Sequence, residues 1–205
     1  TISASVTARA RMLAQTLEQA HIAGLREAVP AFCSVTVFYD PLTVSRGTAD
    51  VSAFAALSAR IQEVASRKGE ARVAPARLVE IPLCYGGEYG QDLESLAAAR
   101  ELSVAEVIAL HSAPTYFVGM LGFAPGLPYL VGLDKRLFSP RRATPRPRVP
   151  RGSVAIGGEH TGIYPFDSPG GWHLIGRTPL AMFDLSRDPP SLLDAGDQVR
   201  FVPIA

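Results

Sequence analysis

Residues 119–132 read GMLGFAPGLPYLVG, and the character of the chain changes at this point. Of the 35 glycines and prolines in the sequence, 24 lie from Gly119 onwards, although that segment is less than half of the 205 residues. Helical periodicity ends near Pro114, and short β-prone runs separated by turn residues replace it. Many short strands with Gly/Pro turns indicate a barrel or a sandwich. The expected strands cover residues 115–121, 153–156, 180–183 and 198–202.

The first part of the chain has the pattern of a small α+β domain. Apolar residues recur at helical spacing over residues 6–24 and again over 50–69, where Asp50 and Gly69 supply start and stop signals. β-prone runs lie at 35–39 and 78–83. This order is typical of two helices that cover one face of an antiparallel sheet. A ferredoxin-like unit would have one more strand before the first helix, so we expect that strand to be missing here.

Two short helices are predicted next, at residues 92–101 and 103–111. Ser103 and Glu106 have the spacing of a capping box, in which each side chain satisfies a backbone N–H of the first helical turn. The glycine pair before these helices breaks the preceding strand. We therefore expect two domains, an α+β domain over residues 1–88 and a β-barrel domain over residues 89–205.

Composition and charge exclude several classes of protein. With 47% hydrophobic and 19% charged residues, the chain can bury a sizeable core, and the composition favours a folded protein over a disordered one. The formal net charge of +1 provides no general attraction to nucleic acid or membranes. Cys33 and Cys84 lie far apart, which favours reduced thiols. No apolar run reaches the ~20 residues that span a bilayer, and no signal peptide is visible. We expect a cytoplasmic protein.

The common catalytic motifs are absent. The sequence contains no GxxxxGK[ST] loop, no GxSxG elbow and no HExxH helix. The four histidines are scattered, and none has a Cys or His at metal-ligand spacing. We therefore predict no metal site, and if ATP is used, it is not held by a Walker loop of this chain.

A basic segment over residues 135–151 carries seven positive charges and no acid. Such a segment can be a solvated loop. However, its four prolines restrict the backbone, which lowers the entropy lost when guanidinium groups are directed at an anion. Arginine suits carboxylates and phosphates, whereas nucleic acid fits less well because no aromatic stacking pattern accompanies the charge. The candidate anion-binding residues are Arg141, Arg146 and Arg148.

Two further stretches, at residues 122–129 and 164–173, combine glycines and prolines with aromatic residues. They can be barrel corners where only Gly and Pro fit. They can equally form the wall of a binding pocket, in which glycines let a ligand approach the backbone and aromatic rings supply apolar faces. The residues proposed for that wall are Tyr129, Tyr164, Gly170, Gly171 and Trp172.

Three histidines are weighed for catalysis. His111 closes a predicted helix, where a cation suits the helix dipole, so a capping role is favoured over catalysis. His160 and His173 flank the turn-rich stretch and are the candidates for proton transfer.

The turn-rich half carries a long motif that resembles a known family. Residues 122–184 read GFAPGLPYLVGLDKRLFSPRRATPRPRVPRGSVAIGGEHTGIYPFDSPGGWHLIGRTPLAMFD. This stretch is similar to the signature of the allophanate hydrolase subunit 1 family, which includes the B-type subunit of 5-oxoprolinase and the kinase inhibitor KipI. The resemblance extends upstream through IPLCYGGEYGQDLESLAAARELSVAEVIALHSAPTY and downstream to LLDAGDQVRFVPI.

The resemblance implies a fold and an activity. It implies a small ferredoxin-like α+β domain followed by a cyclophilin-like β-barrel, without prolyl isomerase activity. It also implies a hydrolase subunit whose partners are allophanate hydrolase subunit 2 (the C-type subunit of 5-oxoprolinase) and the A-type subunit of 5-oxoprolinase, in the ATP-dependent opening of 5-oxoproline to glutamate. Leu127 and His160 depart from the residues common in relatives, Phe and Gln, which leaves the ligand open.

Two other activities stay open. One is inhibition of a sensor histidine kinase, as KipI suggests, in which the aromatic and proline surface would dock on another protein. The other is a carboxyltransferase-type module of an allophanate or urea carboxylase system, which would require biotin-linked partners because this chain has no biotin-attachment sequence.

Overall fold

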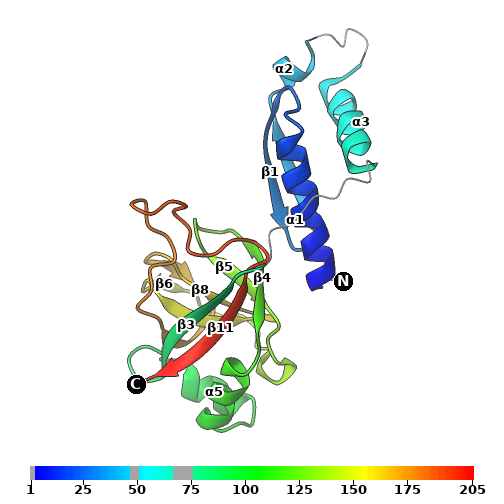
Figure 1. The fold of residues 1–205 in the computed structure, drawn as a ribbon. Helices are drawn as coiled ribbons and strands as arrows, with labels where there is room; N and C mark the ends of the chain where they lie inside the picture. The colour runs from blue at the N-terminus through cyan, green and yellow to red at the C-terminus, as the bar shows by residue number, and fades with distance from the viewer. Residues whose placement is uncertain (1–2, 47–50, 67–75) are drawn as a thin grey trace. The chain divides into compact units, whose positions relative to one another are not determined.

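The computed structural model describes residues 3–46, 51–66 and 76–205, and the chain divides at Pro75 into unit 1 (Thr1–Pro75) and unit 2 (Ala76–Ala205) (Figure 1). This boundary lies earlier than the expected one between residues 88 and 89, because strand β3 (Leu78–Tyr85) belongs to unit 2. β3 pairs over Leu78–Cys84 with β11 (Gln198–Ile204), about 120 residues later in the chain, and its Ile81 and Leu83 are fully buried.

Unit 1 packs helices against one β-hairpin. Helix α1 (Ala4–Gln19) begins after Ser3, whose hydroxyl accepts a hydrogen bond from the Val6 N–H, and it contacts strands β1 (Leu25–Ala31) and β2 (Ser34–Tyr39). Two further helices, α2 and α3, follow. The predicted helices and the strand at 35–39 are confirmed, whereas β1 was not predicted. The bounds of the later helices are α2 (Pro41–Val44) and α3 (Ala53–Ser66), and the expected start and stop at Asp50 and Gly69 lie outside the described residues.

Unit 2 is built on a closed barrel in the strand order β10-β3-β11-β4-β5-β8-β7. The predicted β-barrel is therefore confirmed, with short strands that turn residues separate. Two more strands, β6 and β9, pair only with each other. The remaining strands are β4 (Tyr116–Leu121), β5 (Pro128–Val131), β6 (Arg146–Val149), β7 (Ser153–Gly157), β8 (His160–Ile163), β9 (Ser168–Gly170) and β10 (His173–Arg177).

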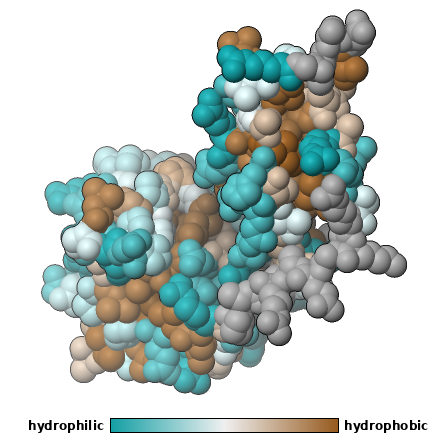
Figure 2. Space-filling model, turned by 45° about the horizontal axis from the view of Figure 1, so that its top comes forward, coloured by the Kyte–Doolittle hydropathy of each residue, from teal (hydrophilic) through white to brown (hydrophobic). Residues whose placement is uncertain are grey.

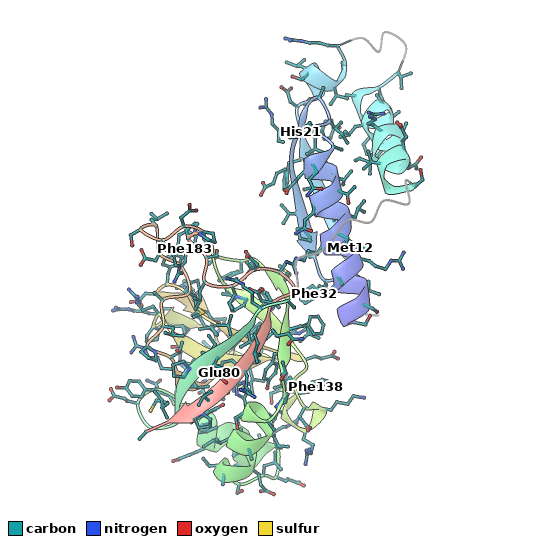
Figure 3. The ribbon with its side chains drawn as sticks, in the orientation of Figure 1. Met12, His21, Phe32, Glu80, Phe138 and Phe183 are labelled. Atoms are coloured by element: carbon teal, nitrogen blue, oxygen red, sulfur yellow. The ribbon has the colours of Figure 1, made fainter. Side chains whose placement is uncertain are left out.

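One expected strand, at residues 180–183, does not form. The Arg187 guanidinium donates to the carbonyl oxygens of Ala181 (3.2 Å) and Met182 (3.3 Å), and the Leu192 N–H also donates to the Met182 carbonyl (2.8 Å). The segment makes only an isolated bridge, between Phe183 and Ser191, in the loop-rich part of unit 2 where Figure 3 places Phe183.

Two helices and a 3-10 turn accompany the barrel. Helix α5 (Val104–Ser112) has the predicted capping box, since the Ser103 hydroxyl accepts from the Glu106 N–H and the Glu106 carboxylate accepts from the Ser103 N–H. The other helices are α4 (Leu93–Ala99), within the range expected for it, and η1 (Lys135–Leu137).

Side chains alternate between the inside and the outside of the barrel wall. Leu130, Ile156 and Ile175 belong to the large core inside the barrel. Their neighbours Tyr129, Ala155 and Leu174 belong to a smaller apolar cluster on the outer side. This alternation follows from the period of two along a strand, and it gives β5, β7 and β10 a second packed face outside the barrel.

The surface mixes hydrophilic and hydrophobic patches (Figure 2). On β3, Glu80 forms an ion pair with Arg200, its register partner on β11 (Figure 3). No helix in the described ranges is both long enough and apolar enough to cross a membrane.

Candidate functional site

A pocket of about 240 Å³ lies against the outer face of the barrel at strands β5 and β8. It brings together residues from four segments that the sequence separates by up to about fifty positions. Six of the eight residues predicted for anion binding and for the pocket wall line it. The lining consists of Phe123, Leu127, Tyr129, Arg141, Pro145, Gly162, Ile163, Tyr164, Pro169, Gly170, Gly171 and Trp172.

Two strand glycines make room for Trp172, which is 93% buried. A Cβ atom on Gly157 would lie 2.5 Å from the indole ring, and one on Gly162 would lie 3.0 Å from it and 2.7 Å from the Pro128 carbonyl oxygen. No other residue type fits at either position without moving the ring or the strand. The indole therefore lies directly on the barrel wall and forms the floor of the site.

Two tyrosines complete the aromatic wall. Tyr129 meets Trp172 edge to face, with ring centroids 5.5 Å apart and an interplanar angle of 82°. Tyr164 lies against Gly170, where a Cβ atom would collide with the phenol group. Burial raises the pKa of Tyr164, as does Tyr129, and a hydrogen bond from the Trp172 backbone opposes that rise together with the positive charges of Arg141 and Arg146. Both rings thus present apolar faces to the pocket.

Arg141 is held at the rim by hydrogen bonds on both sides of it. The Arg142 N–H donates to the Gly171 carbonyl (2.8 Å), and His173 Nε2 donates to the Pro140 carbonyl (2.9 Å). The segment that carries Arg141 is thereby fastened to the segment that carries Trp172. In the described part of the chain, no carboxylate pairs with the Arg141 guanidinium, which remains available to a ligand.

Phe123 forms another part of the rim. Its side chain is 72% exposed, and its backbone φ is 69°, in the left-handed region that bulky residues rarely adopt. The loop is closed by a hydrogen bond from the Gly122 N–H to the Leu127 carbonyl (3.1 Å). A strained, exposed aromatic residue beside a cavity is a feature of ligand-binding sites. Sequence reasoning did not select Phe123, because left-handed backbone at a phenylalanine leaves no signal in the sequence.

Arg146 forms an ion pair with a buried carboxylate. Asp92, 5% exposed at its side chain, accepts two hydrogen bonds from Arg146 (2.7 and 2.8 Å), one from Arg142 (2.7 Å) and one from the Leu174 N–H (2.8 Å). Burial alone would raise the pKa of Asp92, but these hydrogen bonds and the two guanidinium charges hold it below the ordinary value. Both terminal nitrogens of Arg146 are therefore already used, although the sequence suggested a role in binding anions.

Arg148 lies on the surface, away from the pocket lining. It donates to the Asp167 carboxylate from Nε at 2.8 Å, and the side chains are 78% and 38% exposed. An exposed pair of this kind contributes about 0–1 kcal/mol to stability. Among the three arginines predicted to bind anions, only Arg141 lines the pocket.

The two histidines predicted for proton transfer lie beside the pocket and are not part of its lining. His173 uses Nε2 to hold the Pro140 carbonyl, which is a positioning contact. His160 begins β8 next to Tyr129, with ring centroids 6.4 Å apart. Burial lowers the pKa of His160, against smaller opposing effects of the Leu130 backbone and Glu159. Their role in proton transfer stays a prediction.

His111 is fully buried inside the barrel, where it belongs to a chain of hydrogen bonds that runs from Tyr85 to the Ala155 carbonyl. The Thr161 hydroxyl donates to the Ala155 carbonyl (3.1 Å), so His111 Nε2–H donates to Thr161 (2.9 Å) and the Tyr85 hydroxyl donates to Nδ1 (2.7 Å). Burial lowers the pKa of His111 to about 3. The imidazole is therefore neutral, and the predicted role as a helix-capping cation is wrong, because the ring points into the core.

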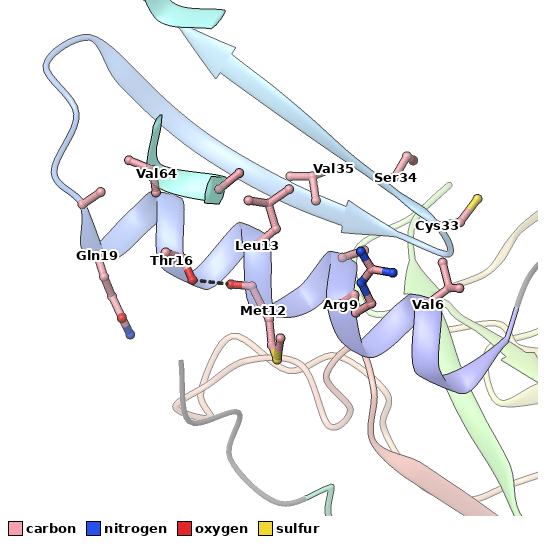
Figure 4. A pocket seen from close by; sticks show the side chains of 13 residues that line it. Val6, Arg9, Met12, Leu13, Thr16, Gln19, Cys33, Ser34, Val35 and Val64 are labelled. Carbon is pink, nitrogen blue, oxygen red and sulfur yellow. Dashed lines mark hydrogen bonds between the residues drawn. The ribbon is translucent and has the colours of Figure 1, made fainter. Parts of the chain in front are cut away.

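Unit 1 contains a wider groove, of about 810 Å³, between α1, the hairpin and α3 (Figure 4). Its lining is mainly aliphatic, with Arg9 as the charged side chain, and the Thr16 hydroxyl donates to the Met12 carbonyl of its own helix (2.8 Å). The groove brings no set of reactive groups together. Within the described ranges, no group of three or more His, Cys, Asp and Glu side chains could hold a metal ion in either unit.

Comparison with known proteins identifies the class. A family model described as carboxyltransferase domain, subdomain C and D, matches residues 1–193, and the chain belongs to this family. The urea amidolyase of Kluyveromyces lactis, whose solved structure is 22% identical with a TM-score of 0.76 over all of this chain and 14% of that one, shares the fold.

A nearer relative sharpens this assignment. The chain is 47% identical over 191 residues to the B-type subunit of 5-oxoprolinase from Bacillus subtilis, a match that covers 92% of this chain and 80% of the relative. The solved structure of TTHA0988 is 40% identical, with a TM-score of 0.83, over all of this chain but only 38% of that one. The resemblance predicted from residues 122–184 is therefore confirmed. The Bacillus relative is named as one subunit, that is, as part of a multi-subunit enzyme.

Proposed function

We propose that this chain acts as the B-type subunit of an ATP-dependent 5-oxoprolinase, a hydrolase complex that opens 5-oxoproline to glutamate. The observation that carries the proposal is the 47% identity to the Bacillus B-type subunit over nearly the whole chain. Subunits of the A and C types would complete the enzyme, and we expect the complex in the cytoplasm, where ATP is available.

The chemistry explains why ATP is needed. A lactam is an amide, and its carbonyl carbon is a poor electrophile at neutral pH. Transfer of the γ-phosphoryl group of ATP to the lactam oxygen would yield ADP and an activated C–O–phosphate group. Water then adds at that carbon and the C–N bond breaks, with the nitrogen leaving as the free amine, which yields γ-glutamyl phosphate. A second water hydrolyses this acyl phosphate to glutamate and phosphate. The developing negative charge in such a step is stabilised by fixed positive groups, which the complete complex would supply.

Reconstitution tests the proposal directly. ATP hydrolysis is measured with and without 5-oxoproline, for this chain alone and for mixtures with the A- and C-type subunits of the same genome. We expect substrate-dependent hydrolysis only in the complete mixture. Absence of 5-oxoproline-dependent hydrolysis in every combination would contradict the proposal and favour the kinase-inhibitor prediction.

The family match supports a second candidate. The matched model describes a carboxyltransferase domain, so transfer of a carboxyl group between biotin and a small amide is the alternative. It predicts that free biotin or a biotinylated carrier protein binds the chain. Turnover of 5-oxoproline by a mixture that contains no biotin would exclude the alternative for this chain.

A further inference from the structure

We propose that the outer-face pocket binds a small ring that carries a single carboxylate, with Arg141 pairing the carboxylate and the Tyr129–Trp172 wall covering the ring. This inference rests on the proposed function and assigns the substrate site of the complex, rather than the nucleotide site, to this chain.

The size of the pocket sets the class of ligand. Its volume of about 240 Å³ lies below the ~300–1,000 Å³ of pockets that enclose drug-sized ligands. A nucleoside triphosphate, with a base, a ribose and three phosphates, is too large for this space. A five- or six-membered ring with one substituent fits it.

The walls favour a flat, largely apolar molecule. Trp172 lies flat on the strand glycines, and Tyr129 stands perpendicular to it, so that the corner between them can hold a ring on two sides. Gly170 and Gly171 border the same space without side chains, which lets a polar edge of the ligand approach the backbone.

The charge at the rim selects an anion. Arg141 is the one guanidinium among the lining residues, and it has no carboxylate partner in the described part of the chain. Arg142 and Arg146 share the single carboxylate of Asp92, so this cluster keeps a net charge of +1 in addition to the charge of Arg141. One free guanidinium fork matches one carboxylate, whereas a polyphosphate needs several donors.

The backbone that carries Arg141 is also fixed in place before any ligand binds. The backbone on both sides of Arg141 is fastened by the hydrogen bonds from Arg142 to Gly171 and from His173 to Pro140. The Arg142 side chain is in turn held by its hydrogen bond to the Asp92 carboxylate. His173 and Asp92 are thus positioning residues. A fixed backbone reduces the entropy lost on binding and makes a small ligand with few contacts sufficient.

Trp172 provides a direct readout, because it is the one tryptophan of the sequence. The full chain is titrated with 5-oxoproline (ring and carboxylate), 2-pyrrolidinone (ring without carboxylate) and ATP, while tryptophan emission is recorded, and saturation-transfer NMR repeats each titration independently. We expect saturable binding of 5-oxoproline. Binding of 2-pyrrolidinone should be weaker by about 10-fold or more, because a charge-assisted pair is lost.

Matched variants locate the carboxylate. Arg141→Ala should weaken the binding of 5-oxoproline by about 10-fold or more and leave the binding of 2-pyrrolidinone unchanged. Arg148→Ala, which removes an exposed arginine of the same segment, should bind 5-oxoproline as the parent chain does. Equal affinity of the parent chain and Arg141→Ala for 5-oxoproline would overturn the inference. So would ATP binding more tightly than 5-oxoproline, or the absence of 5-oxoproline binding in both measurements.

The two proposals fail separately. If the reconstituted mixture hydrolyses ATP in response to 5-oxoproline while Arg141→Ala changes neither binding nor turnover, the pocket assignment is wrong and the function stands. If the chain binds ring carboxylates through Arg141 but no mixture turns over 5-oxoproline, the pocket assignment stands and the function is wrong.

Discussion

The inner and outer faces of strands β7 and β8 use their residues in opposite ways. Inside the barrel, Thr161 belongs to a hydrogen-bond chain in which every polar atom has a partner, and His111 is held neutral beside the rings of Tyr116 and Phe201. On the outer face, Gly157 and Gly162 leave space that Trp172 and a pocket occupy, beside an arginine with no carboxylate partner in the described residues. The alternation of a β-strand thus separates stability from binding across one barrel wall.

The largest loss of stability is expected at Asp92, whose carboxylate pairs with both Arg142 and Arg146. Asp92→Ala should lower the free energy of unfolding by about 3–5 kcal/mol, because it leaves Arg142 and Arg146 partly buried without a counter-charge. Urea denaturation measures the loss. A decrease below about 1 kcal/mol would show that the outer face does not depend on this cluster.

The next effect concerns the inner face and its response to acid. His111 has a folded pKa of about 3, so between about pH 6 and pH 3 the unfolded chain binds a proton at this residue that the folded chain does not. This residue therefore stabilises the fold fully above its unfolded pKa, and that contribution decreases by about 1.4 kcal/mol per pH unit as the pH falls through this window.

His111→Gln isolates this contribution. The variant should be less stable at pH 7 because its hydrogen bonds are imperfect, but its stability should change less steeply between pH 6 and pH 4 than that of the parent chain. Urea denaturation at a series of pH values gives both slopes. Parallel slopes would mean that His111 is not buried in the neutral form.

A smaller effect is expected from filling the space under Trp172. Gly162→Ala should destabilise unit 2 by about 1–3 kcal/mol, because the new Cβ lies 2.7 Å from the Pro128 carbonyl and 3.0 Å from the indole. The tryptophan emission maximum should shift as the ring moves. Gly171→Ala is the matched control, since its Cβ would make only ordinary contacts at 3.7 Å, and its emission should stay unchanged.

The smallest effect is expected at the exposed arginine. Arg148→Ala should change the free energy of unfolding by less than about 1 kcal/mol, because its pair with Asp167 is open to solvent. A thermal melt of this variant beside Arg146→Ala tests the distinction between the two. Similar losses in both would contradict the division of the basic segment into buried and exposed arginines.

The sequence alone was sufficient to predict much of the pocket lining, but it could not predict which arginine pairs with a carboxylate. Tyr129, Tyr164 and Trp172 were selected because aromatic residues among Gly/Pro turns are typical of binding walls, and all three line the pocket. Local pattern could not show that Asp92, more than fifty residues earlier, engages Arg146, so it could not distinguish Arg146 from Arg141.

The same limit applied to the fold. The capping box at Ser103 is local, and it was predicted correctly. The place of β3 in the barrel depends on pairing with β11 far along the chain, so the domain boundary was set too late. Residues 180–183 have a β-prone pattern, but their backbone pairing is limited to an isolated bridge, and Arg187 donates to two of the carbonyls.

The most direct measurement is 5-oxoproline-dependent ATP hydrolysis by the reconstituted complex, with this chain as the parent, as Arg141→Ala or as Arg148→Ala. The account predicts that Arg141→Ala loses about 10-fold or more in kcat/KM for 5-oxoproline, while Arg148→Ala retains the parent value. Full activity of the Arg141→Ala complex would contradict the claim that the outer-face pocket binds the substrate.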